Sequence, residues 1–275
     1  IPLKIHMKMI FEIRDLNYAT PATVTRAGVV LMADYEGVQW RSFKSAWIKK
    51  IQFPPNMAVD QCDKLRDDLT KLFDKYCIET LNFIRRQCKT QVDMYDVAMI
   101  DKLCYLLDSI IFNNPQPELL QALEYWFNFC TIWACGACLS EVDGVDYRKQ
   151  FSNWWKNEMK TIKFPSKGTV FDYYVKESRL EDFSTMVEAI EFNSETPMNE
   201  VTVPTGETVS MSFIMQALVE VQCPVMLIGL AGTGKTQCCN GLLKGLNPEA
   251  WASATISFNF YTDYSLLMTM MEIPL

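Results

Sequence analysis

The chain has 275 residues, of which 49% are hydrophobic and 21% are charged, and its net charge is −7. This composition excludes a collagenous, low-complexity or disordered chain and leaves room for two ordinary domains or one large one. The acidic balance argues against non-specific nucleic-acid binding, which would need a basic patch acting against the overall field.

The N-terminal residues predict a strand, a short helix and a second strand. From Ile5 to Ile13, apolar side chains alternate with polar ones, as in a strand with one buried face. Thr20 and Pro21 are a helix-capping residue and a first-turn proline, and Gly28 fits the position after a helix of about two turns. Val29 to Met32 then favours a short strand. Because the chain begins without Met or a signal peptide, we expect it to start inside a longer protein.

Residues from about 40 to 160 are predicted to be mostly helical. Apolar side chains recur at three- or four-residue steps from Cys62 to Cys88 and from Ile100 to Ile110, with charged residues between them. An aromatic-rich helix is expected from about Glu118 to Leu139. Its charge-free part, residues 125–140, is shorter than the roughly 18 to 20 residues of a spanning helix, so we expect a buried helix and no membrane segment.

The 10 cysteines, without a signal peptide, are typical of reduced cytosolic thiols rather than of a disulfide framework. Cys135 and Cys138 have the spacing of half a zinc site. No second close pair accompanies them and the only histidine is the distant His6, so core cysteines are the favoured interpretation.

A different composition begins near Phe164. Residues 201–210 predict two short extended segments around a turn, Met211 to Val219 a helix, and Pro224 to Ile228 a buried strand. A local basic stretch is interpreted as a solvated face, and it contains Lys156, Lys160, Lys163 and Lys167.

One motif in the sequence indicates a binding site for a ligand with phosphate groups. The phosphate-binding loop pattern G-x-x-x-x-G-K-[ST] is matched without a mismatch by Gly229, Leu230, Ala231, Gly232, Thr233, Gly234, Lys235 and Thr236. An apolar run leads into the loop, and residues 237–246, beginning with Gln237, can form the helix that must follow. Such a loop lets backbone N–H groups converge on phosphate oxygens at the positive end of the helix. The alternative is a glycine-rich turn with an incidental Lys-Thr.

The motif predicts ATP or ADP as ligand, bound by residues from Gly229 to Gln237. Lys235 is expected to reach the β- and γ-phosphates, and the Thr236 hydroxyl to be a ligand of Mg²⁺. A strand-like run follows at Ala254–Phe260, but no Asp-Asp or Asp-Glu pair follows an apolar strand after Thr236. Because the acidic Walker B group is missing from this stretch, we expect the chain alone not to hydrolyse ATP efficiently.

Several segments together resemble the dynein heavy chain family. The run from Phe11 to Gly28, followed by Gln39 and Trp40, resembles the end of the second AAA+ large subdomain of these proteins. The segment Phe164–Tyr174 resembles the entry to the third module, and Pro224–Thr236 resembles the phosphate loop of that module. The sequences of these segments are most similar to those of axonemal, outer-arm-type chains.

The resemblance implies an α/β fold of the AAA+ P-loop NTPase class. Residues 1–33 would end one large subdomain, residues 34–165 would form its helical small subdomain, and residues 166–275 would open the next large subdomain. The whole protein would be an ATP-dependent, minus-end-directed microtubule motor of the axoneme in cilia and flagella, located in the cytoplasm and cytoskeleton. Its implied partners are neighbouring AAA+ modules, dynein intermediate and light chains, and microtubules, with no nucleic acid and no membrane.

The same resemblance gives expected roles to two charged residues. Arg26 would be a trans arginine finger that stabilises charge on the γ-phosphate of the first module's nucleotide; the alternative is a surface arginine. Glu12 would stand where other modules carry a polar sensor, and a carboxylate there would be a poor γ-phosphate sensor.

Two functions stay open. In one, the loop is a regulatory nucleotide site that gates the main site of a motor ring. In the other, the segment is a structural or interaction module whose nucleotide is not exchanged or turned over. A small P-loop kinase is disfavoured because it would need an arginine-bearing lid after the loop, and no arginine follows Arg179.

Overall fold

The structure is a computed structural model that describes residues 10–30, 32, 37–55, 57–113, 115–187 and 203–272. It divides into two compact units, Ile1–Gln39 and Trp40–Leu275, each considered by itself.

The first unit contains the short helix expected from its sequence, α1, Pro21–Arg26. The Thr20 side chain accepts a hydrogen bond from the Thr23 N–H at 3.3 Å, and the proline occupies the first turn. The Ala27 N–H closes the last turn on the Thr23 carbonyl at 3.2 Å. The capping prediction is therefore confirmed.

The strands predicted on either side of α1 are not found in the described residues. Residues 1–9 lie outside that part of the chain, and residues 10–13 lie outside regular secondary structure. Val29, Val30 and Met32 are exposed and belong to no strand, while residue 31 is not described. A strand needs a hydrogen-bonded neighbour, and none pairs with these segments in the described ranges.

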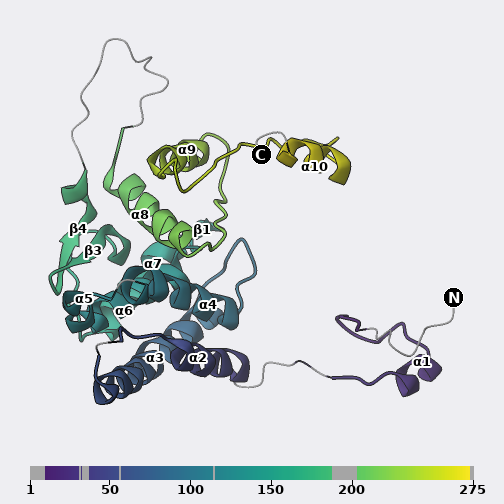
Figure 1. Cartoon of the computed structure of the whole chain (residues 1–275), viewed down its shortest axis with the longest axis horizontal. Coiled ribbons are helices and arrows are strands. Elements are labelled where there is room, and N and C mark those ends of the chain that lie inside the picture. The colour runs from purple at the N-terminus through teal and green to yellow at the C-terminus, as the bar shows by residue number, and fades with distance from the viewer. Residues whose placement is uncertain are drawn as a thin grey trace, which may run out of the picture. The chain divides into compact units, whose positions relative to one another are not determined.

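The second unit begins with the helical region predicted for residues 40–160, shown in blue and teal in Figure 1. Its elements are α2 (Val38–Lys50), α3 (Val59–Gln87), α4 (Asp96–Leu107), the π-helix η1 (Asp108–Phe112), α5 (Pro117–Gln121), α6 (Leu123–Gly136) and α7 (Tyr147–Glu158). The aromatic helix expected near 118–139 is divided at Ala122, whose φ and ψ of −93° and 19° interrupt the helical backbone.

Helix α6 is the centre of this region, and every residue from Trp126 to Gly136 is buried. A side chain at Gly136 would place its Cβ 2.6 Å from the Phe171 ring, so glycine allows the helix to approach that ring. In the ranges that the structure describes, no helix has the length and apolar character needed to cross a membrane.

Two small antiparallel hairpins follow. Strand β1 (Glu141–Val142) pairs with β2 (Val145–Asp146), and β3 (Tyr173–Lys176) pairs with β4 (Arg179–Asp182). Both are joined by two residues with positive φ, which matches the twist of tight hairpin turns. Short 3₁₀ turns flank β3 and β4, namely η2 (Val170–Asp172) and η3 (Phe183–Met186).

The remaining elements are the helices α8 (Gly206–Glu220), α9 (Lys235–Gly245) and α10 (Tyr264–Glu272). The prediction of two short extended segments around a turn over residues 201–210 is wrong from Gly206 onward, because α8 begins there. Thr205 and Thr208 form a reciprocal capping box there. The part of the extended prediction at residues 201–202 lies outside the described residues.

The strands predicted at Pro224–Ile228 and Ala254–Phe260 are also not observed. Both segments have strand-like sequences, but no neighbouring segment pairs with them in the described part of the chain. Many of their apolar side chains are exposed, including Met226 and Phe260.

Helix α8 contributes to the same hydrophobic core as the helical region. The Phe213 ring of α8 makes an edge contact with Phe129 of α6 at a centroid distance of 5.8 Å. It also contacts Phe183 of η3 at 6.0 Å. The core thus extends from the helices before residue 160 into the segment that leads to the phosphate-loop motif.

Candidate nucleotide-binding site

The phosphate-loop motif forms a turn followed by α9, as the sequence predicted. Gly232 and Gly234 have φ values of 81° and 83°, in the left-handed region where L side chains are strained. A Cβ at either position would meet no atom within 4 Å. These glycines are therefore required by backbone conformation rather than by space.

The start of α9 offers unpaired backbone donors. Gly234 is the N-cap residue, and no side chain caps the helix. The first N–H groups of a helix have no intrahelical partner, and the helix dipole adds positive potential there. This arrangement suits a phosphate group.

Lys235 turns back over its own loop. Its Nζ donates to the carbonyl oxygens of Gly229 and Leu230 at 2.9 and 2.5 Å and to the Thr233 hydroxyl at 3.2 Å. The Thr233 hydroxyl donates to the Leu230 carbonyl at 3.0 Å. The ammonium group is therefore held beside the loop. When a phosphate binds, its oxygens would replace these neutral oxygens as acceptors of the ammonium.

The other predicted loop residues lie around this centre. Ala231, Thr236 and Gln237 are exposed, and the Thr236 hydroxyl has no hydrogen-bond partner in the described ranges. Backbone donors, one ammonium and one open hydroxyl form a donor set that fits a polyphosphate with a bound cation.

Helix α9 packs against α8 (Figure 1). Between them the chain passes through Cys223, which is buried at the end of α8. The Ser109 hydroxyl of η1 lies 3.5 Å from the Glu220 carboxylate of α8. The loop is thus attached to a helix that belongs to the core of the helical region. No periodicity in the sequence pointed to this attachment.

Arg26 lies in the last turn of α1 and is exposed. Its guanidinium makes no hydrogen bond or ion pair with any described residue. Glu12 is likewise exposed, outside regular secondary structure. Their expected roles as arginine finger and sensor position stay predictions.

All ten cysteines are free thiols in the structure. Cys135 is buried, and burial raises the pKa of its thiol to about 12. Cys138 is exposed. Among the residues that the structure describes, no group of three or more metal-ligating side chains is found.

The basic stretch is partly structural. The Lys156 ammonium donates to the carbonyl oxygens of Pro165 and Gly168 at 2.7 and 2.8 Å and so fixes the loop after α7. Lys160, Lys163 and Lys167 are exposed, as a solvated face requires.

Comparison with known proteins gives two family matches. Residues 69–185 match the dynein heavy chain AAA lid domain, and residues 190–275 match the P-loop containing dynein motor region. The second match includes the phosphate-loop motif.

Curated relatives align over almost the whole chain. Dynein axonemal heavy chain 9 of Homo sapiens is 37% identical over 100% of this chain. The dynein alpha chain of the flagellar outer arm of Chlamydomonas reinhardtii is 37% identical over 98%. Dynein heavy chain-like protein 2 of Plasmodium falciparum is 30% identical over 99%. The chain spans 6% of the length of the first two of these relatives and 5% of the third.

These matches confirm the AAA+ fold class expected from the sequence. The order of the two matched domains agrees with the structure, in which the helical region precedes α8, the loop and α9. The chain therefore belongs to the dynein heavy chain family and contains an AAA lid domain followed by a P-loop motor region.

Proposed function

We propose that this chain is a segment of a dynein motor ring that supplies a regulatory nucleotide-binding loop. Residues 1–33 end the large subdomain of the second AAA+ module, residues 34–165 form its helical small subdomain, and residues 166–275 open the third module. The observation that carries the proposal is the loop geometry, with left-handed Gly232 and Gly234 leading into the uncapped start of α9.

The loop binds ATP or ADP through its backbone N–H groups, from Gly229 to Gln237. Lys235 exchanges its contacts with loop carbonyls for the β- and γ-phosphate oxygens. Thr236 presents its hydroxyl to Mg²⁺, which neutralises phosphate charge when bound. The motif and the open donors at the start of α9 support this assignment.

The whole protein is an ATP-dependent, minus-end-directed microtubule motor of the axoneme, with cytoplasmic and cytoskeletal location. The names of the relatives, which are axonemal, ciliary and flagellar dyneins, support this proposal. Its partners are the neighbouring AAA+ modules and, through the full complex, intermediate chains, light chains and microtubules.

Arg26 completes the nucleotide site of the first module in trans. Its exposed position and its lack of a partner among the described residues are consistent with that role. A guanidinium that reaches a γ-phosphate stabilises the charge that develops there during hydrolysis.

A second candidate is a structural module whose nucleotide is never exchanged. It is favoured by the contacts of Lys235, because the ammonium is already satisfied by three loop oxygens and the loop has a defined conformation of its own. In that case the bound nucleotide would stiffen the module, and no exchange between ATP and ADP would regulate the rest of the ring.

The experiment compares Lys235→Ala with Lys244→Ala in the full-length motor. Lys244 is an exposed lysine in the last turn of the same helix and serves as the matched control. The regulatory function predicts slower microtubule gliding for Lys235→Ala alone, and exchange of labelled nucleotide at this loop. Normal velocity for Lys235→Ala, together with labelled nucleotide that never exchanges, would support the structural candidate instead.

A further inference from the structure

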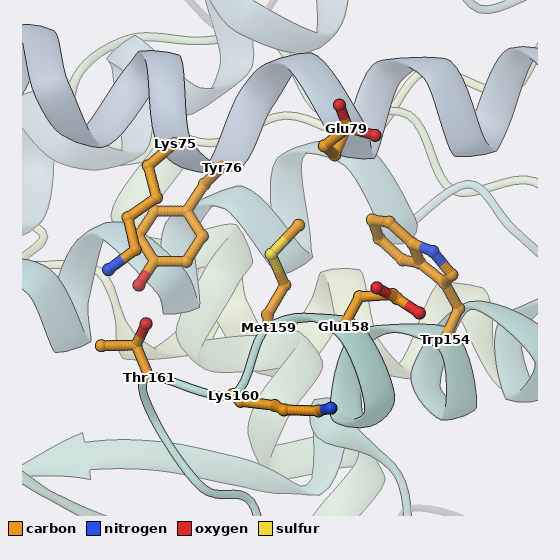
Figure 2. Close-up of a pocket in the computed structure, with 8 residues that line it drawn as sticks. All are labelled: Lys75, Tyr76, Glu79, Trp154, Glu158, Met159, Lys160 and Thr161. Carbon is orange, nitrogen blue, oxygen red and sulfur yellow. The ribbon is translucent and has the colours of Figure 1, made fainter.

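Two cavities in the helical region differ in how their charged groups are paired. The first, of about 390 Å³, lies between α3 and the end of α7 (Figure 2). Figure 2 shows Lys75 and Tyr76 at one end and Trp154 at the other. The Lys75 ammonium and the Tyr76 hydroxyl both donate to the Glu124 carboxylate, at 2.7 and 2.6 Å. The Lys75 ammonium at this end of the cavity therefore already has a counter-ion, the Glu124 carboxylate, inside the fold.

The second cavity, of about 580 Å³, lies between α2, residues 51–54 and η1. Its wall contains the carboxylate of Asp108. The Trp47 indole N–H donates to both carboxylate oxygens, at 3.1 and 3.0 Å. Within the described residues no cation pairs with Asp108, although Lys50 lines the same cavity. A single neutral donor is a poor match for a carboxylate, which accepts several hydrogen bonds.

A rare backbone feature places Asp108 in this wall. The Asn113 N–H donates to the Asp108 carbonyl at 2.7 Å, five residues back along the chain, which defines the π-helical turn η1. The turn begins at Asp108 and ends at Phe112, and both residues line the cavity. Single π-helical turns are uncommon in proteins, and those that occur are often at functional sites.

Aromatic rings form the rest of the wall. Phe112 makes edge contacts with Trp47 and Phe53, at centroid distances of 5.7 and 6.2 Å. The Arg66 guanidinium lies 5.0 Å from the Phe53 centroid and pairs with Asp63, so one of these rings already interacts with a cation. Aromatic faces beside a carboxylate are the surroundings in which proteins hold ammonium and guanidinium groups.

The negative charge of Asp108 is unfavourable in its surroundings. Burial raises the pKa of its carboxyl group, which means that the charged form is disfavoured where it stands, and the Trp47 hydrogen bond offsets this only in part. An asparagine would keep one of the two oxygens that accept the indole N–H and would remove the charge. A partly buried carboxylate that has no counter-ion among the described residues and that costs stability where it stands points to an external partner for its charge.

We propose that the cavity between α2, residues 51–54 and η1 binds a basic side chain, lysine or arginine, of a partner protein. Asp108 is its counter-ion. The rings of Trp47, Phe53 and Phe112 contact the aliphatic stem and the cationic head. The cavity volume is within the range of sites that hold a small molecule or a side chain. This site is separate from the phosphate loop, so its test does not depend on nucleotide binding.

The test uses the whole chain labelled with ¹⁵N. The chain has seven tryptophans, and the indole N–H signal of Trp47 is assigned by its loss in Trp47→Phe. The probes are the capped peptides acetyl-Gly-Arg-Gly-amide and acetyl-Gly-Lys-Gly-amide. Matched peptides with citrulline or leucine at the centre lack the charge. Citrulline keeps the shape and most hydrogen-bonding groups of arginine, so it isolates the contribution of charge.

The proposal predicts that both basic peptides shift the Trp47 signal with saturation, and that the citrulline peptide binds at least about tenfold more weakly. Asp108→Asn weakens the basic peptides by a similar factor while its Tm is unchanged or higher. Asp101→Asn is the control in α4, because that carboxylate already pairs with Lys102 at 3.1 Å, and it leaves peptide binding unchanged.

Equal binding of the arginine and citrulline peptides would overturn the proposal, as would tighter binding of the leucine peptide, which would indicate an apolar pocket. The absence of any shift with the basic peptides would also overturn it. The comparison among peptides is made on the unaltered chain, so it decides the question even if the variant at Asp108 does not fold.

Discussion

The helical region and the phosphate-loop region have opposite distributions of apolar surface. In the helical region, Phe127 is 0% exposed and lies against the edge-on ring of Phe73 and the tilted ring of Tyr76. After α8, Phe260 is 96% exposed and Leu230 is 82% exposed. Yet the phosphate loop itself has a defined conformation. Its shape comes from local backbone preferences, whereas the stability of the helical region comes from burial.

The difference shows which features a segment can form by itself. A helix satisfies its own backbone hydrogen bonds, so α9 forms directly after the loop. A strand depends on a neighbour, so the strand-like residues 224–228 and 254–260 stay outside regular structure in the described part of the chain. The phosphate loop and α9 therefore take their shape without the strands that the sequence predicts on either side of them.

Truncation of one aromatic ring in each region should give the largest difference in stability between the two. Phe127→Ala is expected to lower the free energy of unfolding by about 3–5 kcal/mol, because it opens a cavity in a fully buried core. Phe260→Ala is expected to change it by no more than about 0.5 kcal/mol. Urea unfolding followed by far-UV circular dichroism measures both. Similar losses for the two variants would mean that the exposed ring packs against something in solution.

Glycine substitutions in the two regions should change stability by smaller amounts and in opposite directions. Gly136→Ala is expected to cost about 1–3 kcal/mol, since its Cβ would lie 2.6 Å from the Phe171 ring. Gly241→Ala in α9 meets nothing within 4 Å and is expected to stabilise the helix by up to about 1 kcal/mol. Thermal unfolding of the two variants should shift in opposite directions, and a shift in the same direction would contradict the packing described for α6.

The contact between the regions is open to a double-mutant cycle. Phe129→Leu and Phe213→Leu each remove one ring of the edge contact between α6 and α8. A coupling energy of about 0.5–1.5 kcal/mol is expected, because edge-to-face rings attract beyond their buried area. Coupling near zero would indicate that α8 is not held on the helical region through these rings.

The smallest expected effect is on pH dependence at Asp108. Its folded-state carboxyl pKa is raised by burial, so the native state binds more protons than the unfolded state as pH rises from the unfolded to the folded pKa. Stability should therefore fall over that acidic window and then stay level with respect to this group. In Asp108→Asn this fall should disappear, as measured by urea midpoints across the window, and an unchanged slope would show that another group causes it.

The parts of the fold that follow from local sequence were predictable. Thr20 with Pro21 indicated α1, the apolar period from Cys62 to Cys88 indicated α3, and the glycine pattern indicated the loop and α9. In each case the signal lies within the element itself, in its cap, its period or its left-handed glycines.

Other parts were misread or invisible for physical reasons. Thr205 and Thr208 form a capping box, but the β-branched residues around them favoured an extended interpretation. The pairing of Trp47 with Asp108 joins residues 61 positions apart, and no short-range pattern encodes it. The π-helical turn that presents Asp108 leaves no periodic signature distinct from that of an α-helix.

If the loop binds nucleotide through its own residues, titration calorimetry of the chain with Mg-ADP detects that binding. We expect saturable binding that Lys244→Ala leaves unchanged. Lys235→Ala should weaken it at least about tenfold, since hydrogen bonds from a charged donor contribute about 1.5–3 kcal/mol. Equal affinities for the two lysine variants, or no binding by the unaltered chain, would show that Lys235 and its loop do not form the nucleotide site.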